Sequence, residues 1–182
     1  MMEPGSKLME FVAKNGATIE LRIPDTNLTE QYLLFINELV EEDAPIKLNV
    51  PQDYASEARY LANKISNIIA GDEVAIAAFD KGKLVADASI IRNFGREKEA
   101  GTLGIAISKG YRNIGIGRII IDQLLTLAQK SNFRLVVLDV YSNNPGAIHL
   151  YEKLGFQKAG TIPKIARFGN EYFDSIRMFK AL

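Results

Sequence analysis

The sequence predicts a single domain, residues 1–182, of the mixed α/β class, and three observations support that prediction. Short apolar runs with the length of strands alternate with segments in which apolar residues recur at the helical period. The run 135–141 is almost continuously apolar and follows a helical segment, which is typical of a strand buried on both faces and parallel to its predecessor. That predecessor, 103–107, leads into a glycine-bearing turn that opens a helix. With 47% apolar residues, the chain can fill one continuous core.

Charge and cysteine content exclude several classes of function. The 22 basic residues balance the 22 acidic ones, so no net field draws the chain to nucleic acid or to an anionic membrane. No stretch approaches the ~20 apolar residues of a membrane span, and the start lacks the pattern of a secretory signal. We therefore expect a cytoplasmic protein. Because there is no cysteine, disulfides, thiolate metal sites and a cysteine nucleophile are excluded.

The first half of the chain predicts a hairpin, two helices and a second hairpin. Residues 1–6 are expected to be disordered. Asn15-Gly16 between two apolar runs is the strongest short signal for a hairpin, and Asp80–Lys83 separates two further runs in the same way. The predicted elements are strands 11–14 and 18–23, helices 29–42 and 54–70, and strands 74–79 and 84–91.

The second half predicts strands and helices in alternation, followed by a closing hairpin. A charged loop, 92–101, precedes the first strand of this half. The elements are strand 103–107, helix 116–129, strand 135–141, helix 145–154 and a hairpin of 160–167 with 172–179. We expect about six to seven strands in a mixed sheet with helices on both faces.

The turn Tyr111-Arg112-Asn113-Ile114-Gly115-Ile116-Gly117-Arg118 has the features of a phosphate cradle. Its glycines let the backbone come close to a ligand, and the first N–H groups of the following helix have no partner within the helix. The helix dipole and the two arginines add positive charge. No Lys-Ser or Lys-Thr follows the second glycine, and the three-glycine dinucleotide spacing is missing, so ATP and NAD are disfavoured. An ordinary glycine-containing turn remains an alternative.

A second segment, 143–156, follows the strand 135–141. Asn144 is expected to cap a helix that has Pro145 at its first position and ends at Gly155. Tyr151 lies on the apolar face of this helix. It is either a core aromatic residue or a functional one, and its hydroxyl needs a partner when buried.

Together the two segments resemble motifs A and B of the GCN5-related N-acetyltransferase (GNAT) family. The first has Arg-x-x-Gly-x-Gly after a strand, and the second has Asn-x-x-Ala-x-x-Leu-Tyr-x-x-x-Gly-Phe. The fixed positions of the second motif are all present: Asn144, Ala147, Leu150, Tyr151, Gly155 and Phe156. The resemblance covers residues 103–156, whereas the first hundred residues match the family only in the order of their elements.

The resemblance implies a site for acetyl-CoA and no metal. The turn would hold the pyrophosphate through Arg112, Asn113, Ile114, Gly115, Ile116, Gly117 and Arg118. The strand 103–107 would splay from its parallel neighbour and expose main-chain groups of Ile105, Ala106 and Ile107 to the pantetheine arm and the thioester. Asn144 would border the cofactor, and Tyr151 would hydrogen-bond the sulfur and protonate the departing thiolate.

The general base is less well defined by the sequence. An aliphatic ammonium has a pKa of about 10, so only about one molecule in a thousand is neutral at pH 7 and a base must take its proton. Asp139 occupies a position where some protein N-terminal acetyltransferases of the family carry a glutamate; alternatively it is hydrogen-bonded within the sheet. Asp87 is unusual in an apolar strand, or simply faces solvent.

The acceptor site is likewise an expectation from the family. Glu42, in the charge run 41–43, would lie near the acceptor groove, and Tyr172 would border it from the closing hairpin. The alternatives are a solvated loop and ordinary pairing between strands. His149 is expected to face water.

The sequence thus predicts an N-acetyltransferase that moves an acetyl group from acetyl-CoA to a small amine or amino acid. The alternatives are a protein N-terminal or lysine acetyltransferase and, from another class, a non-catalytic acyl-CoA sensor. A nucleotide-binding regulatory domain is a further alternative. Many members of the family form homodimers through their terminal strands, which this sequence does not test.

Overall fold

The computed structural model describes residues 3–182, which contain one sheet of eight strands. The strands are β1 (Lys7–Val12), β2 (Thr18–Arg22), β3 (Glu73–Asp80), β4 (Lys83–Arg92), β5 (Ala100–Ile107), β6 (Leu135–Tyr141), β7 (Gln157–Phe168) and β8 (Glu171–Ala181). The helices are α1 (Thr29–Glu41), α2 (Tyr54–Ala70), α3 (Ile116–Lys130) and α4 (Pro145–Lys153). Three short 3-10 turns are η1 (Thr26–Leu28), η2 (Gly95–Glu97) and η3 (Lys109–Tyr111).

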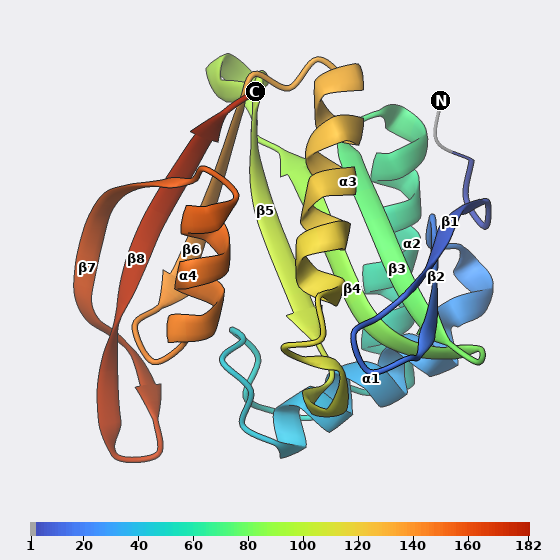
Figure 1. The fold of residues 1–182 in the computed structure, drawn as a ribbon, viewed down its shortest axis with the longest axis horizontal. Helices are drawn as coiled ribbons and strands as arrows, with labels where there is room; N and C mark the ends of the chain where they lie inside the picture. The colour runs from blue at the N-terminus through green and yellow to red at the C-terminus, as the bar shows by residue number, and fades with distance from the viewer. Residues whose placement is uncertain (1–2) are drawn as a thin grey trace.

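The sheet has the order β1-β2-β3-β4-β5-β6-β8-β7, with α1 and α2 on one face and α3 and α4 on the other (Figure 1). The mixed α/β class and the helices on both faces are confirmed. The expected count of six to seven strands is too low, because both outer hairpins join the same sheet: β2 pairs with β3, and β8 pairs with β6.

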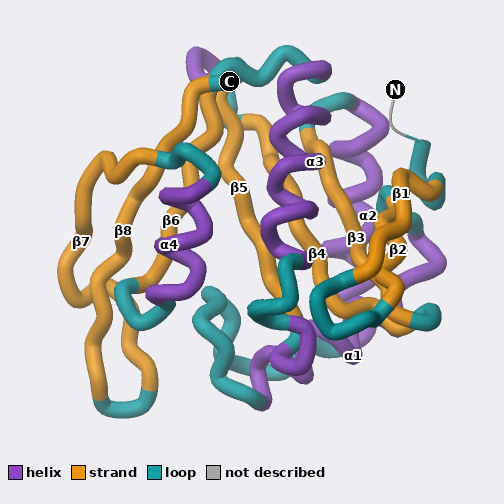
Figure 2. The backbone as a smooth tube through the Cα atoms, in the orientation of Figure 1, coloured by secondary structure: helices purple, strands orange, loops and turns teal. Residues whose placement is uncertain are grey.

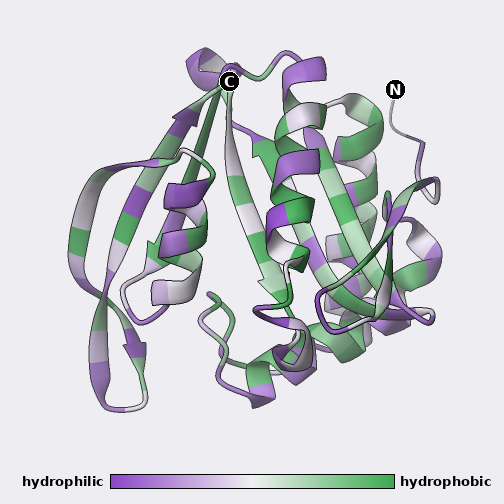
Figure 3. Ribbon diagram, viewed as in Figure 1, coloured by the Kyte–Doolittle hydropathy of each residue, from purple (hydrophilic) through white to green (hydrophobic). Residues whose placement is uncertain are grey.

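Each face of the sheet has its own apolar core. Along β3, Val74, Ile76 and Ala78 pack toward α3, whereas Ala75 and Ala77 pack toward α1 and α2. This alternation follows from the two-residue period of a strand. Figure 3 shows the mainly hydrophobic central strands and the more polar outer hairpin of β7 and β8. The central strands therefore contribute side chains to both apolar cores.

Strands β5 and β6 are parallel neighbours for only three residue pairs. Ala100–Thr102 pair with Leu135–Val137, and beyond them the two strands diverge. Strand β5 remains paired with β4 as far as Ile107, and β6 remains paired with β8 as far as Tyr141. The expected parallel arrangement is confirmed, and the carboxyl halves of the two strands are separated (Figure 1).

The expectation that β6 is buried on both faces is wrong. Val136, Leu138 and Val140 are buried, whereas Asp139 between them is exposed. The reason is that α3 and α4 cover one face of the strand, while its other face borders the opening left by the divergence from β5.

The loop between α1 and α2, residues 42–53, lies against this opening (Figure 2). Helix α2 begins after Asp53, whose carboxylate accepts a hydrogen bond from Ser56 N at 2.7 Å, and it ends at Gly71 with φ of 79°. The cap at Asp53 thus sets the end of the loop, which begins after α1 at Glu42.

The amino-terminal end is more ordered than expected. Gly5 N donates to Ile23 O at 3.0 Å, and Ile23 N donates to Ser6 O at 2.9 Å, so this segment is held against the end of β2. Residues 1 and 2 of the segment that was expected to be disordered lie outside the described residues. Within residues 3–182, the helices are too short or too polar to cross a bilayer.

Candidate active site

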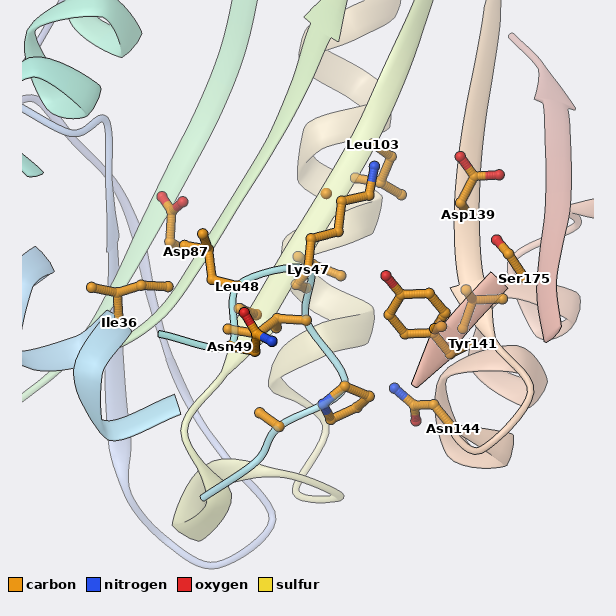
Figure 4. A pocket seen from close by; sticks show the side chains of 18 of the residues that line it. Ile36, Lys47, Leu48, Asn49, Asp87, Leu103, Asp139, Tyr141, Asn144 and Ser175 are labelled. Carbon is orange, nitrogen blue, oxygen red and sulfur yellow. The ribbon is translucent and has the colours of Figure 1, made fainter. Parts of the chain in front are cut away.

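The divergence of β5 from β6 opens a cleft of about 910 Å³. Figure 4 shows Asp87 of β4 on one wall and Tyr141 and Asn144 on the other, with the loop that carries Lys47 between them. Other wall residues come from β5, β7 and β8, from the helices α1, α2 and α4, and from further positions of β4 and β6. The cleft thus brings together segments from most of the chain.

The edge of β5 that faces the cleft has no neighbouring strand. Its residues 103–106 line the cleft, and β4 occupies only the opposite edge. Ile105 and Ala106, two of the three predicted thioester contacts, are therefore on the cleft wall. Ile107 follows at the strand end, where its carbonyl accepts a hydrogen bond from Arg112 Nε at 2.8 Å.

The predicted phosphate turn leads from the end of β5 to the amino terminus of α3. Asn113 and Gly115 have positive φ values of 63° and 95°, so the chain turns sharply before the helix. A Cβ on Gly117 would lie 3.2 Å from Ile107 Cδ1 and from Leu150 Cδ2, so the helix start packs closely on β5 and α4. No side chain among the described residues caps α3, which leaves its first N–H groups for a ligand.

Two of the predicted site residues contact each other. Arg112 forms an ion pair with Glu42. Glu42 lies just after α1 and Arg112 just after η3, so this contact ties the end of α1 to the predicted phosphate turn. Glu42 is outside the cleft wall, whereas its neighbour Asp43 is part of it. Arg118 is exposed on the first turn of α3.

Tyr151 of α4 is 7% exposed and lines the cleft. Its ring packs edge-on against Phe156, with centroids 5.8 Å apart. Among residues 3–182 no side chain or carbonyl is within hydrogen-bonding reach of its hydroxyl, and Ser108 Oγ alone is both unpaired and sealed from solvent. The Tyr151 hydroxyl therefore opens into the cleft. Burial raises the pKa of Tyr151 to about 12, so it remains protonated at neutral pH.

Asn144 and Asp139 both line the cleft, in different roles. Asn144 caps α4 as predicted, with Oδ1 accepting from Ala147 N at 3.2 Å. Asp139, the predicted base, accepts hydrogen bonds from Arg177 Nε and Nη2, both at 3.2 Å. Its two oxygens are thus engaged by a cation on β8. The assignment of Asp139 as a base stays a prediction.

A buried polar cluster that the sequence interpretation missed lies on the α2 side of the cleft. We call it the Lys64 cluster. Lys64 of α2 donates to Asp87 Oδ2 at 2.9 Å, lies 3.5 Å from Glu73 and is 3.3 Å from the Tyr60 hydroxyl. Tyr32 of α1 donates to Asp87 Oδ1 at 2.6 Å.

Asp87 does not face solvent, contrary to one of the two expectations for it, because the helices α1 and α2 bring donors to both of its oxygens. The position of Lys64 in the sequence could have revealed this cluster, since Lys64 lies three residues after Leu61 on the apolar face of α2. A lone lysine on such a face indicates a buried carboxylate partner.

The remaining predicted residues lie away from the cleft. Tyr172 is 58% exposed and is paired with Arg167 near the tip of the β7–β8 hairpin. Its role at the acceptor site stays a prediction. His149 is exposed as expected. Within residues 3–182 no three His, Cys, Asp or Glu side chains are grouped as a metal site requires.

The comparisons with known proteins identify the family. The model of the Acetyltransferase (GNAT) family matches residues 34–156, which is more than half of the chain. The chain therefore belongs to the GNAT family.

A curated relative is the [ribosomal protein bS18]-alanine N-acetyltransferase of Escherichia coli, 36% identical over 61 residues, which are 34% of this chain and 41% of that protein. The chain thus matches less than half the length of this relative, and 28% of the length of a probable N-acetyltransferase from Drosophila melanogaster, to which it is 40% identical over 52 residues.

Solved structures share the fold over nearly the whole chain. An acetyltransferase of the GNAT family from Streptococcus pneumoniae matches with a TM-score of 0.81 and 24% identity, over 90% of this chain and 99% of that one. A GNAT superfamily phosphinothricin acetyltransferase from Sinorhizobium meliloti, in complex with acetyl-CoA, matches with a TM-score of 0.79 and 20% identity, over 90% and 88% of the two chains. Some structural neighbours therefore bind acetyl-CoA.

Proposed function

We propose that the protein transfers the acetyl group of acetyl-CoA to a primary amine, by direct attack of the amine on the thioester in a ternary complex. One observation carries this proposal. The unpaired hydroxyl of Tyr151, which suits a thiolate, lines the opening between β5 and β6, and the free amino terminus of α3, which suits a diphosphate, packs at Gly117 against Ile107 of β5 and Leu150 of α4. Membership of the GNAT family supports the same reaction.

The described residues fit acetyl-CoA at each of its parts. The N–H groups of Ile116, Gly117 and Arg118, at the positive end of α3, would bind the diphosphate. The free edge of β5 offers main-chain N–H and C=O groups to the pantetheine arm. The amides of that arm can hydrogen-bond to them as a neighbouring strand would. Bound in this way, acetyl-CoA would supply an activated acetyl group.

Tyr151 would act as the general acid. When the amine nitrogen forms a bond to the acetyl carbon, the carbon–sulfur bond breaks and the sulfur leaves as a thiolate. The hydroxyl of Tyr151 would hydrogen-bond this sulfur and give it a proton. Its raised pKa suits an acid that must still carry its proton at neutral pH.

We further propose that the acceptor is a small amine or an amino acid. The loop Asp43–Asn49 lies across the cleft, and Ile162 and Ile165 of β7 line it from the other side. Strand β7 is irregular between Ile162 and Ala166, which places these apolar residues at the wall. Such a partly closed mouth favours a small molecule. The names of the relatives include both a ribosomal-protein and a phosphinothricin acetyltransferase, so a protein amino terminus or lysine remains the alternative.

The test is CoA release by the wild-type protein with acetyl-CoA and two sets of acceptors. One set holds polyamines and amino acids, and the other holds short peptides with a free amino terminus or an internal lysine. Turnover on the first set, with initial-rate patterns of a ternary complex, is the expected result. Turnover on the peptides alone would favour the alternative acceptor. Tight acetyl-CoA binding without turnover would indicate a sensor, and absence of acetyl-CoA binding would overturn the proposal.

A further inference from the structure

Glu57 is a buried carboxylate that faces the cleft. It lies in the first turn of α2, one turn before Tyr60, is 5% exposed, and is part of the cleft wall together with Asp87. Neither the resemblance to motifs A and B nor the sequence pattern singled it out. A glutamate in this setting is unusual, because buried glutamates are nearly always paired.

Among the described residues, the side chain of Glu57 has no hydrogen-bonding partner. No hydrogen bond or ion pair joins it to any other residue in the range 3–182. Its oxygens are nevertheless not sealed, since Ser108 Oγ is the one side-chain polar atom of that range that is both unpaired and closed to solvent. The carboxylate therefore presents its free lone pairs to the cleft.

The nearest cation is already engaged. Lys64 lies two turns further along α2, and its ammonium is shared by Asp87, Glu73 and the Tyr60 hydroxyl. Glu73 and Asp87 thus share one ammonium, and Glu57 adds a third carboxylate that makes no contact with it. The α2 side of the cleft has an excess of negative charge that a bound cation would offset.

Of the three other carboxylates that line the cleft, Asp43 is exposed to solvent on the loop, and Asp87 and Asp139 are already hydrogen-bonded. Asp87 accepts from Tyr32 at Oδ1 and from Lys64 at Oδ2. Asp139 accepts from Arg177 at both oxygens. A proton on either carboxylate would break an existing hydrogen bond, whereas a proton on Glu57 breaks none.

We propose that Glu57 is the carboxylate that binds the ammonium group of the acceptor and takes its proton. This inference rests on the proposed acetyl transfer. In the step, a proton moves from the ammonium nitrogen to a Glu57 oxygen, and the nitrogen lone pair that is released attacks the acetyl carbon. The carbon–sulfur bond then breaks, and the sulfur takes a proton from Tyr151. The tetrahedral nitrogen loses its second proton to water as the amide forms.

The surroundings of Glu57 tune it for this step. Burial raises its pKa, the charge of Asp87 raises it further, and Lys64 opposes both. The other titratable groups around it are Tyr32 of α1, Tyr60 of α2 and Glu73 of β3, with Asp43 and Lys47 on the loop across the cleft. Lys47 rises in the middle of the cleft from this exposed loop (Figure 4). A base with a raised pKa transfers protons more effectively near neutral pH.

The test compares Glu57→Gln with a matched control, Glu30→Gln. Glu30 is the acidic residue in the first turn of α1, as Glu57 is in α2, but it is exposed and lies outside the cleft. Asp139→Asn is the third variant. For each, CoA release is measured between pH 6 and 10 with the best acceptor of the wild-type protein, and acetyl-CoA binding and the melting temperature are measured alongside.

We expect Glu57→Gln to lower kcat/KM for the amine by about 100-fold or more and to abolish the acid limb of its pH profile. Acetyl-CoA binding should be unchanged, and the melting temperature should not fall. Glu30→Gln should match the wild type in every measurement.

Three outcomes would overturn the inference while leaving the acetyltransferase intact. The first is a Glu57→Gln protein whose rate and pH profile stay within about threefold of the wild type. The second is loss of the acid limb in Asp139→Asn instead. The third is a large drop in melting temperature for Glu57→Gln, which would show a structural role. A wild-type protein without turnover on any amine would instead overturn the proposed function itself.

Discussion

Lys64 of α2 and Asp87 of β4 form an ion pair that is almost closed to solvent, with Nζ and Oδ2 2.9 Å apart and with side chains 1% and 13% exposed. Burial alone would lower the pKa of Lys64, but the charge of Asp87, followed by Tyr60 and Glu73, outweighs it and raises the pKa above its usual range. Because the pKa of Lys64 is raised in the folded state, the stabilisation that comes from its charge is fully present below the usual pKa of lysine and is lost as the pH rises through the folded value.

The first prediction follows from this pair. Replacing Lys64 with Met should lower the free energy of unfolding by about 3–5 kcal/mol, because Asp87 and Glu73 would be left buried without their cation. Urea denaturation at pH 7 measures the effect. The control is Lys158→Met, at an exposed position of β7. Equal midpoints for the two variants would show that the buried pair does not stabilise the fold.

Tyr151→Phe should separate turnover from binding. The change removes the hydroxyl that we propose to bond the sulfur, while the ring keeps its contact with Phe156. We expect kcat to fall by about 100-fold or more, the range for loss of a general acid, with an unchanged KM for acetyl-CoA. Since the pKa of Tyr151 is about 12, the wild-type rate should show no loss from this residue up to pH 10. A Phe variant with full activity would assign Tyr151 to the core.

The start of β5 should not tolerate a larger residue. A Cβ on Gly101 would lie 2.6 Å from Ile90 Cγ2 and from a ring carbon of Phe133, whereas one on Gly104 would meet nothing within 4 Å. Gly101→Ala should therefore cost about 1–3 kcal/mol of stability through overpacking, and Gly104→Ala on the same strand should cost less. Thermal unfolding of both variants compares the two sites. Equal losses would mean that the strand, not the contact with Phe133, resists substitution.

Much of this architecture could be predicted from the sequence because its signals are local. The helix 54–70 was predicted with its true ends, since Asp53 and Gly71 stop it and the apolar period fills it. The turn before α3 and the helix that carries Tyr151 were predicted in the same way, because their neighbours in the sequence determine the local structure; the roles of these residues stay predictions. The number of strands in the sheet was not predicted correctly, because the pairing of the outer hairpins depends on contacts between segments that are distant in the sequence.

The acceptor side of the cleft could not be predicted because its residues meet only in the folded chain. Glu57 and Asp87 line one wall although 30 positions separate them, and the contact of Arg112 with Glu42 spans 70 positions. No periodicity in the local sequence indicates a contact between such distant positions. Asp87 was noticed only as a misfit in an apolar strand, and its partners Tyr32 and Lys64 lie on two different helices.

Gly115→Ala should weaken the proposed binding of acetyl-CoA more than it weakens the fold. Gly115 has φ of 95°, a conformation that costs an alanine about 1–3 kcal/mol and would shift the first N–H groups of α3. Isothermal titration with CoA should show about tenfold weaker binding. Gly71→Ala is a matched control, since its φ is 79° at the end of α2 and a Cβ there would meet nothing within 4 Å. Equal CoA affinity in both variants would argue against a diphosphate at this turn.

The charge of Glu57 should make the protein less stable above neutral pH. Burial, followed by the charge of Asp87, raises the pKa of Glu57 in the folded state. A carboxyl whose pKa is higher when folded binds its proton more tightly there, so its stabilising effect is present below the pKa of the unfolded chain and is lost as the pH rises through the folded value. Glu57→Gln carries no such charge at any pH. We therefore expect this variant to have a higher melting temperature than the wild type at pH 8 and a similar one at pH 4.

Scanning calorimetry across this range measures the difference, with Glu30→Gln as the exposed control. A Glu57→Gln protein that is less stable at pH 8 would mean that the carboxylate has a partner in the fold, and it would then be a structural residue instead of a site that accepts a cation.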